Sequence, residues 1–182
     1  MEPTTGNDGV SRTWDRAMRV ENASPPSDRG NGLHRREQGL RVVVADDHDA
    51  LRQCVCRFLT EAPGLEIIGQ AANGQEAITL TRELTPDVVL MDVSMPHVNG
   101  IEATRQIVRD CPAVRVVAMS ATLDRTTVTC MLDAGASGWV SKTGLFNTLL
   151  EAIGTVSAGK HYICTEAASV LGNHRTAKEP AE

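Results

Sequence analysis

The sequence predicts an α/β fold, in which a parallel sheet carries helices on both faces. Two observations support this class. Short apolar runs rich in β-branched residues alternate with longer stretches of helical periodicity. Turn-forming or capping residues separate the two kinds of segment. The predicted strands are residues 41–46, 66–71, 87–92, 114–120 and 137–141.

The first two helices are recognised from their ends. A helix over residues 48–61 places apolar side chains on one face and stops at a Pro-Gly pair. The second helix begins at Asn73, because Glu76 follows three residues later with the spacing of a capping box. Pro86 ends that helix, since proline lacks the backbone N–H that a helix needs.

The last three helices complete the alternation. Asn99 and Glu102 repeat the capping pattern and open a helix that runs to Arg109. Residues 124–134 form the fourth helix, which stops at a glycine, and residues 145–157 form the fifth. Five β-α units in a domain of this size predict a flavodoxin-like, doubly wound (βα)5 fold with strand order 2-1-3-4-5.

Composition divides the chain into three segments. Residues 1–39 are rich in Gly, Pro, Ser, Asn and Asp, and we expect a disordered N-terminal extension there. Residues 40–159 are the expected folded domain, and residues 160–182 the expected flexible linker or tail. The net charge of −5 arises within the folded domain, because the acidic and basic residues of the two flanking segments cancel. This charge argues against a general nucleic-acid or anionic-membrane binder.

The cysteine pattern and the distribution of apolar residues predict a cytoplasmic location. The five cysteines form no CxxC pair and no metal-finger spacing, which fits a reducing compartment. The N-terminus has no apolar segment of the kind found in signal peptides. No run approaches the roughly 20 apolar residues of a membrane span.

Reactive side chains stand at the ends of four predicted strands. They are Asp46 and Asp47, then Asp92, Ser120 and Lys142. In a doubly wound sheet, ligands bind beyond the carboxyl ends of the strands, at the switch point between strands one and three. We therefore expect these side chains to converge. Lys142 is also the only lysine of the folded domain, which argues against a general solubilising role.

These groups together suit a metal ion and a phosphoryl group. Clustered carboxylates repel one another unless a cation intervenes, and Mg²⁺ prefers oxygen ligands. A carboxylate can itself attack phosphorus to form an aspartyl-phosphate. An ammonium group and a hydroxyl donor would then neutralise and bind the phosphoryl oxygens.

Four segments in the folded domain resemble the receiver domain of two-component response regulators. They are Val44-Ala45-Asp46-Asp47-His48, residues 91–100 (MDVSMPHVNG), Ser120-Ala121 and residues 135–142 (GASGWVSK). The match covers roughly residues 40–159, in order and at strand ends. The segments are most similar to receivers of the LuxR-type (NarL/FixJ) subfamily, which usually carry a DNA-binding domain.

The resemblance implies a phosphoacceptor and a magnesium site. Asp92 would accept the phosphoryl group. Asp47, Asp92 and the backbone carbonyl of Ser94 would bind Mg²⁺ directly. Asp46 would act through a metal-bound water.

The resemblance also implies a set of switch residues. Ser120 and Lys142 would hold the phosphoryl group, and Trp139 stands where the family often has a smaller aromatic switch residue. Two plainer interpretations stay open: Ser120 could bond its own backbone, and Trp139 could be a packing residue. Thr143 follows the lysine where many receivers have proline, which makes a cis peptide less expected there.

Partners follow from the same resemblance. A sensor histidine kinase would donate the phosphoryl group, and the output face would comprise strand four, helix 124–134, strand five and helix 145–157. A homodimer or a downstream protein partner could use this face. Residues 160–182 are too short and too neutral for a helix-turn-helix, so we expect no direct DNA binding by this chain. A stand-alone receiver and a truncated LuxR-type regulator both remain open.

Two other classes fit less well. A haloacid-dehalogenase-type phosphatase also uses a strand-end aspartate, but it needs a second acid two residues later, where this chain has Ser94. An inactive receiver-like scaffold would not need the complete set of acids, hydroxyl and lysine. The chain is therefore expected to be a signalling protein and not an enzyme, apart from assisting its own phosphorylation and dephosphorylation.

Overall fold

The structure is a computed structural model and describes residues 39–172. Residues 1–38 and 173–182 lie outside the described part. Residues 1–38 of the expected disordered extension and residues 173–182 of the expected tail therefore fall outside it.

One parallel sheet runs through the domain, with strand order β2-β1-β3-β4-β5-β6. The predicted flavodoxin-like fold and the order 2-1-3-4-5 are confirmed for the first five strands. The prediction of five strands is wrong by one, because a sixth strand pairs in parallel with β5 at the sheet edge. The strands are β1 Leu40–Ala45, β2 Leu65–Ala71, β3 Val88–Asp92, β4 Arg115–Ser120, β5 Gly138–Ser141 and β6 Tyr162–Ile163.

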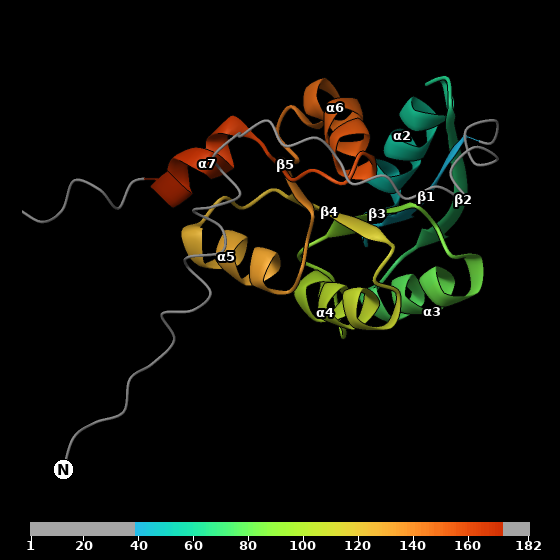
Figure 1. The fold of residues 1–182 in the computed structure, drawn as a ribbon, viewed down its shortest axis with the longest axis horizontal. Helices are drawn as coiled ribbons and strands as arrows, with labels where there is room; N and C mark the ends of the chain where they lie inside the picture. The colour runs from blue at the N-terminus through green and yellow to red at the C-terminus, as the bar shows by residue number, and fades with distance from the viewer. Residues whose placement is uncertain (1–38, 173–182) are drawn as a thin grey trace, which may run out of the picture. The chain divides into compact units, whose positions relative to one another are not determined.

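Helices cover both faces of the sheet. Figure 1 shows α2 and α6 on one face and α3, α4 and α5 on the other. The helices are α2 Asp49–Thr60, α3 Gly74–Leu84, α4 Gly100–Asp110, α5 Arg125–Asp133, α6 Leu145–Ser157 and α7 Thr165–Gly172. Among the described residues, no helix is both long and apolar enough to cross a membrane.

The start of each central helix has a local cause. The side chains of Asn73, Asn99 and Asp124 each accept a hydrogen bond from a backbone N–H in the first helical turn, at 2.9 Å in all three helices. The caps predicted at Asn73 and Asn99 are thus present. Each cap thus fixes the residue at which the helix after a strand begins.

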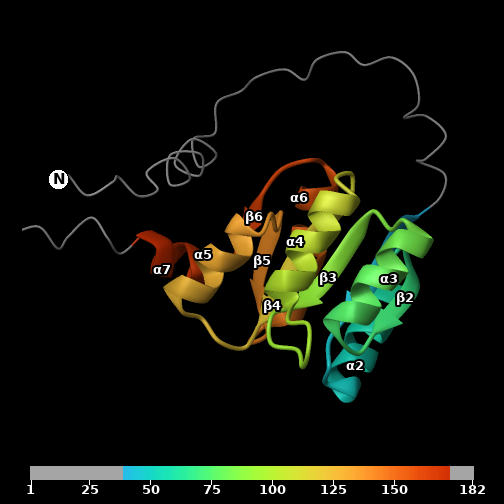
Figure 2. The same ribbon diagram turned by 90° about the horizontal axis from the view of Figure 1, so that it is seen from below.

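Residues 160–172, where we expected a linker, contain β6 and α7. The Tyr162 N–H donates to the Ser137 carbonyl at 3.1 Å, and the Cys164 N–H donates to the Trp139 carbonyl at 3.1 Å. Helix α7 then lies beside α5 (Figure 2), and Arg125 Nη1 donates to the Leu171 carbonyl at 3.0 Å. The edge of β5 organises this segment by offering it backbone hydrogen bonds.

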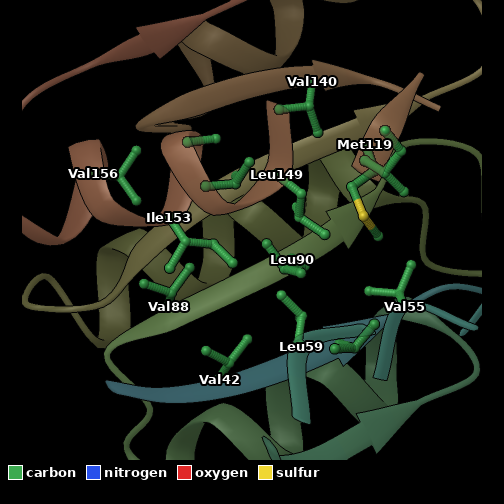
Figure 3. Packing of buried hydrophobic residues seen from close by; sticks show 14 of the residues in the cluster. Val42, Val55, Leu59, Val88, Leu90, Met119, Val140, Leu149, Ile153 and Val156 are labelled. Atoms are coloured by element: carbon green, nitrogen blue, oxygen red, sulfur yellow. The ribbon is translucent and has the colours of Figure 1, made fainter. Parts of the chain in front are cut away.

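The core between the sheet and helices α2 and α6 holds the strand ends in place. Figure 3 shows apolar side chains from the sheet, among them Leu90 and Met119, packed against Leu59 of α2 and Leu149 of α6. All four are fully buried. Burying an aliphatic side chain of this size contributes about 1.5–3 kcal/mol, so the sheet is a rigid platform for groups at its edge.

Candidate functional site

The four strand ends named from the sequence meet at the carboxyl edge of the sheet. Asp92 is the last residue of β3 and Ser120 the last of β4, while Asp46 follows β1 and Lys142 follows β5 directly. Strands β1 and β3 are neighbours, as are β3 and β4, and β4 and β5. The Lys142 N–H also donates to the Ser120 carbonyl at 2.7 Å, which continues the sheet pairing into the site.

Three acids lie together at this edge. Ligand oxygens of Asp46, Asp47 and Asp92 all lie within 4.8 Å of one another. Asp46 is fully buried and Asp92 is almost fully buried, whereas Asp47 is exposed. The cluster therefore has one solvent-facing carboxylate and two that the fold encloses.

Lys142 bridges the two buried acids. Its Nζ lies 2.9 Å from Asp46 Oδ2 and 2.8 Å from Asp92 Oδ2, and its side chain is only 15% exposed. A charge that is removed from water needs such partners, because an unpaired buried charge costs several kcal/mol. With three carboxylates and one ammonium group, the site has a net charge of −2 when all four groups are ionised.

The pKa values of the central pair are perturbed by this environment. Burial raises the pKa of the Asp92 carboxyl above its ordinary value, while the hydrogen bond and charge of Lys142 counteract part of that rise. Burial alone would lower the pKa of Lys142, but its bonds to Asp92 and Asp46 outweigh burial and raise the pKa. Lys142 is thus a fixed positive charge at neutral pH.

Backbone N–H groups orient the two buried carboxylates. Asp46 Oδ1 accepts a hydrogen bond from the His48 N–H at 2.9 Å, and Asp92 Oδ1 accepts one from the Ser94 N–H at 3.2 Å. Each carboxylate therefore uses Oδ1 for its own loop and turns Oδ2 toward Lys142. Asp46 Oδ2 is buried and has the ion pair with Lys142 but no hydrogen bond.

These residues fit a hard divalent cation. Three carboxylates within reach of one another supply the oxygen ligands that Mg²⁺ prefers, and the net charge of −2 matches its charge. Asp46 Oδ2 is a buried acceptor that has an ion pair with Lys142 but no hydrogen bond, which leaves it suited to a metal-bound water. Asp47 provides the solvent-facing ligand through which a hydrated ion could enter.

Ser120 is close by but is bonded within its own loop. Its hydroxyl donates to the Thr122 carbonyl at 2.9 Å and accepts from the Thr122 N–H at 3.1 Å. This is the local backbone bonding that the sequence left open as an alternative. The hydroxyl is nearly buried, so it would have to rotate to donate toward Asp92.

Trp139 does not lie open to the site. It is fully buried in β5, and its indole N–H has no hydrogen-bond partner among residues 39–172. Its β5 position pairs with Ala118 on β4 and Ile163 on β6. In this conformation the ring is therefore a core packing residue.

Arg52 beside the site was not singled out from the sequence, and Gly100 was expected only to have a structural role near it. Arg52 of α2 donates from Nη1 to the Asp46 carbonyl at 2.6 Å and so ties the helix to the acidic loop. Gly100 begins α4 so close to β3 that a Cβ there would collide with the Asp92 carbonyl oxygen. The sequence placed Gly100 next to the predicted cap Asn99, but no sequence spacing indicates the approach of Arg52.

Comparison with known proteins agrees with this geometry. Residues 42–154 match the family model for the response regulator receiver domain. The chain is 42% identical over 132 residues to the response regulator GacA of Pseudomonas protegens, covering 72% of this chain and 62% of GacA. It is 35% identical over 143 residues to the transcriptional regulatory protein LiaR of Bacillus subtilis, covering 78% of this chain and 68% of LiaR.

Solved structures point the same way. A LuxR-family two-component response regulator from Aurantimonas superposes with a TM-score of 0.71 at 33% identity, covering 74% of this chain and 96% of that one. This chain spans about three fifths of the length of GacA, so the match concerns one region of a longer relative. The family match and these identities show that the chain belongs to the response regulator receiver domain family, with its resemblance to LuxR-type receivers confirmed.

Proposed function

We propose that this chain is a phosphorylation-dependent switch of a two-component phosphorelay, with Asp92 as its phosphoacceptor. The main support for this proposal is the position of Lys142, whose ammonium group lies within 3 Å of both Asp92 and Asp46. A cation held at the carboxylate that would be phosphorylated is positioned to bind the incoming phosphoryl oxygens.

The proposed cofactor is Mg²⁺. Asp47, Asp92 and the Ser94 carbonyl would bind it, and Asp46 would reach it through a water. When bound, the ion would neutralise charge on the phosphoryl oxygens during transfer. The acidic cluster supports this assignment, as does the buried Oδ2 of Asp46, which has the ion pair with Lys142 but no hydrogen bond.

The proposed transfer is a substitution at phosphorus. An Asp92 carboxylate oxygen attacks the phosphorus, the bond between phosphorus and the donor nitrogen breaks, and the departing histidine nitrogen keeps the electron pair and takes up a proton. The Lys142 ammonium group changes its ion-pair partner from the Asp92 carboxylate to the negatively charged phosphoryl oxygens. Ser120 turns its hydroxyl from the Thr122 carbonyl to a phosphoryl oxygen. Attack by water on phosphorus later breaks the bond to the Asp92 oxygen, which releases inorganic phosphate and restores the Asp92 carboxylate.

The proposed partner is a sensor histidine kinase, and the proposed response is a change of the output face. That face comprises β4, α5, β5 and α6, and Ser120, Trp139 and Lys142 all lie on or directly after its strands. Addition of a phosphoryl group places new charge where Lys142 and Ser120 can bond it, which biases a two-state element. Trp139 would report this change through a repacked ring.

Radiolabelled acetyl phosphate with Mg²⁺ tests the assignment. We expect the wild-type protein to form a hydroxylamine-sensitive acyl phosphate, and Asp92→Asn to form none. Asp133→Asn is the matched control, because Asp133 is an exposed acid of α5 outside the cluster. Continued Mg²⁺-dependent labelling of Asp92→Asn would contradict the assignment.

A second candidate is the receiver part of a longer transcriptional regulator. The similarity to LiaR, a transcriptional regulatory protein, favours it. An open reading frame that continues in frame beyond Glu182 into a helix-turn-helix would support this candidate. A stop codon directly after Glu182 in the genomic sequence would contradict it.

A further inference from the structure

Arg52 is a largely buried cation beside the acidic site. It lies in α2, and its side chain is only 12% exposed, whereas that of its ion-pair partner Asp49 is 74% exposed. An ion pair with an exposed partner contributes little to stability, so Asp49 does not account for the burial of the guanidinium group. The contact on the buried side is Nη1, which donates to the Asp46 carbonyl at 2.6 Å.

Arg52 holds both ends of the loop of residues 46–48, which joins β1 to α2. Its side chain bonds the Asp46 carbonyl, and its backbone N–H donates to the His48 carbonyl at 3.0 Å. The Asp46 N–H in turn donates to the Ala71 carbonyl at 3.1 Å. The loop is thus held at three points, two of which are bonds from Arg52.

The bond from the Arg52 side chain bears on the residue that follows Asp46. The Asp46 carbonyl belongs to the peptide group that joins Asp46 to Asp47, and a peptide group is planar. Fixing its oxygen therefore fixes the direction in which the chain enters Asp47. The Asp47 side chain is exposed, so this backbone, and not packing around the side chain, sets the position of its carboxylate in the acidic cluster.

Helix stability alone does not explain the placement of Arg52. Its Nε is buried and has no hydrogen-bond partner among residues 39–172. A buried donor without a partner lowers stability, because it has lost its hydrogen bonds to water. A side chain in water, as for the exposed Arg57 on the same helix, avoids this loss.

We propose that Arg52 is a positioning residue for the magnesium site, where it fixes the Asp46 carbonyl and so holds the Asp47 carboxylate where Mg²⁺ would bind. This role rests on the magnesium site proposed above. A guanidinium group has no acceptor atom, so Arg52 cannot itself bind the cation. Its positive charge opposes Mg²⁺ binding, because like charges repel. The charge of Arg52 and its positioning of Asp47 therefore change the Mg²⁺ affinity in opposite directions.

The Kd for Mg²⁺ of the 182-residue chain, obtained from the Tm over a series of MgCl₂ concentrations, tests this role. Each variant is compared with its own magnesium-free protein, so that a change in the stability of the variant itself does not enter the Kd. Arg52→Met keeps an apolar stem and removes the charge and the donors. We expect it to raise the Kd by about tenfold, as the loss of an outer-shell group does at other metal sites. Removal of the charge alone would lower the Kd.

Two further variants complete the test, with circular dichroism checking that each is folded. Arg52→Lys retains the charge but loses the planar fork, so its Kd should lie between those of wild type and Arg52→Met. Arg57→Met is the matched control, because it removes an exposed charge from the last turn of the same helix. Its Kd should stay within about twofold of wild type, since solvent screens that charge.

The outcomes separate the role of Arg52 from the magnesium site itself. A Kd of Arg52→Met or Arg52→Lys equal to or below that of wild type would overturn the positioning role, and so would an Arg52→Lys Kd above that of Arg52→Met. A wild-type protein whose Tm does not respond to Mg²⁺ would refute the proposed magnesium site, and the positioning role with it.

Discussion

Lys142 Nζ lies 2.8 Å from Asp92 Oδ2. The two residues come from strands that are not neighbours, since β4 stands between β3 and β5. The lysine side chain must therefore reach across the end of β4 to meet the carboxylate. Because the same ammonium group also meets Asp46, it holds two buried acids that would otherwise repel each other.

Removal of Lys142 should destabilise the domain. We expect Lys142→Met to lower the free energy of unfolding by about 2 kcal/mol, because two buried carboxylates lose their cation; partial exposure keeps the loss below the range for fully buried pairs. Urea unfolding in magnesium-free buffer measures it. Asp46→Asn in the same background should recover part of the loss, and Lys160→Met, at an exposed lysine, should have little effect. Equal stability of Lys142→Met and wild type would rule out this role.

Magnesium should stabilise the protein through the acidic cluster. A ligand at about ten times its Kd adds about 1.4 kcal/mol to the free energy of unfolding. We expect Mg²⁺ to raise the Tm of the wild type, and Asp47→Asn to lose most of that increase, because it removes the exposed ligand of the cluster. Differential scanning fluorimetry measures the Tm. Asp133→Asn is the matched control, and an equal magnesium effect in both variants would count against the site.

Gly100 should tolerate no side chain. A Cβ at this position would collide with the Asp92 carbonyl oxygen, so either α4 or the end of β3 would have to move. We expect Gly100→Ala to lower the free energy of unfolding by about 2–3 kcal/mol and to impair phosphorylation. Gly154→Ala is the contrast: nothing lies within 4 Å of its Cβ position in α6, so it should stabilise the helix by up to about 1 kcal/mol. Urea unfolding measures the free energy of unfolding of both variants, and a Gly100→Ala variant as stable as wild type would contradict the predicted collision.

Asp110 should make stability depend on acid pH. Hydrogen bonds from Arg109 and Arg82 lower the pKa of this carboxyl to about 2. Because the pKa of Asp110 is lower in the folded state, the ionised carboxylate stabilises the folded protein. This contribution to the free energy of unfolding is complete above the pKa of about 3.9 in the unfolded chain, and it is lost as the pH falls toward about 2. The stability difference between wild type and Asp110→Asn should therefore be constant above about pH 5 and shrink below about pH 4. Denaturant unfolding across this range measures it, and a difference that grows on acidification would contradict the assignment.

The success of the sequence in predicting the fold depended on local signals. Asn73 and Asn99 cap the helices that their spacing indicated, and the first five strands appear in the predicted order. Strand β6 was missed because two residues have no periodicity of their own. Tyr162 and Ile163 form a strand only because the edge of β5 offers free backbone groups.

The candidate site also has features that the sequence predicted and features that only the tertiary structure shows. The apolar runs of the sequence are enough to predict which reactive residues stand at strand ends, namely Asp46, Asp92, Ser120 and Lys142. Which atoms meet was decided by the tertiary structure, because strand order and packing set the distances across the sheet edge. Only there does Lys142 bridge two acids while the Ser120 hydroxyl stays bonded to Thr122. Local sequence thus determined which residues form the site, and contacts between distant segments decided how their charges are paired.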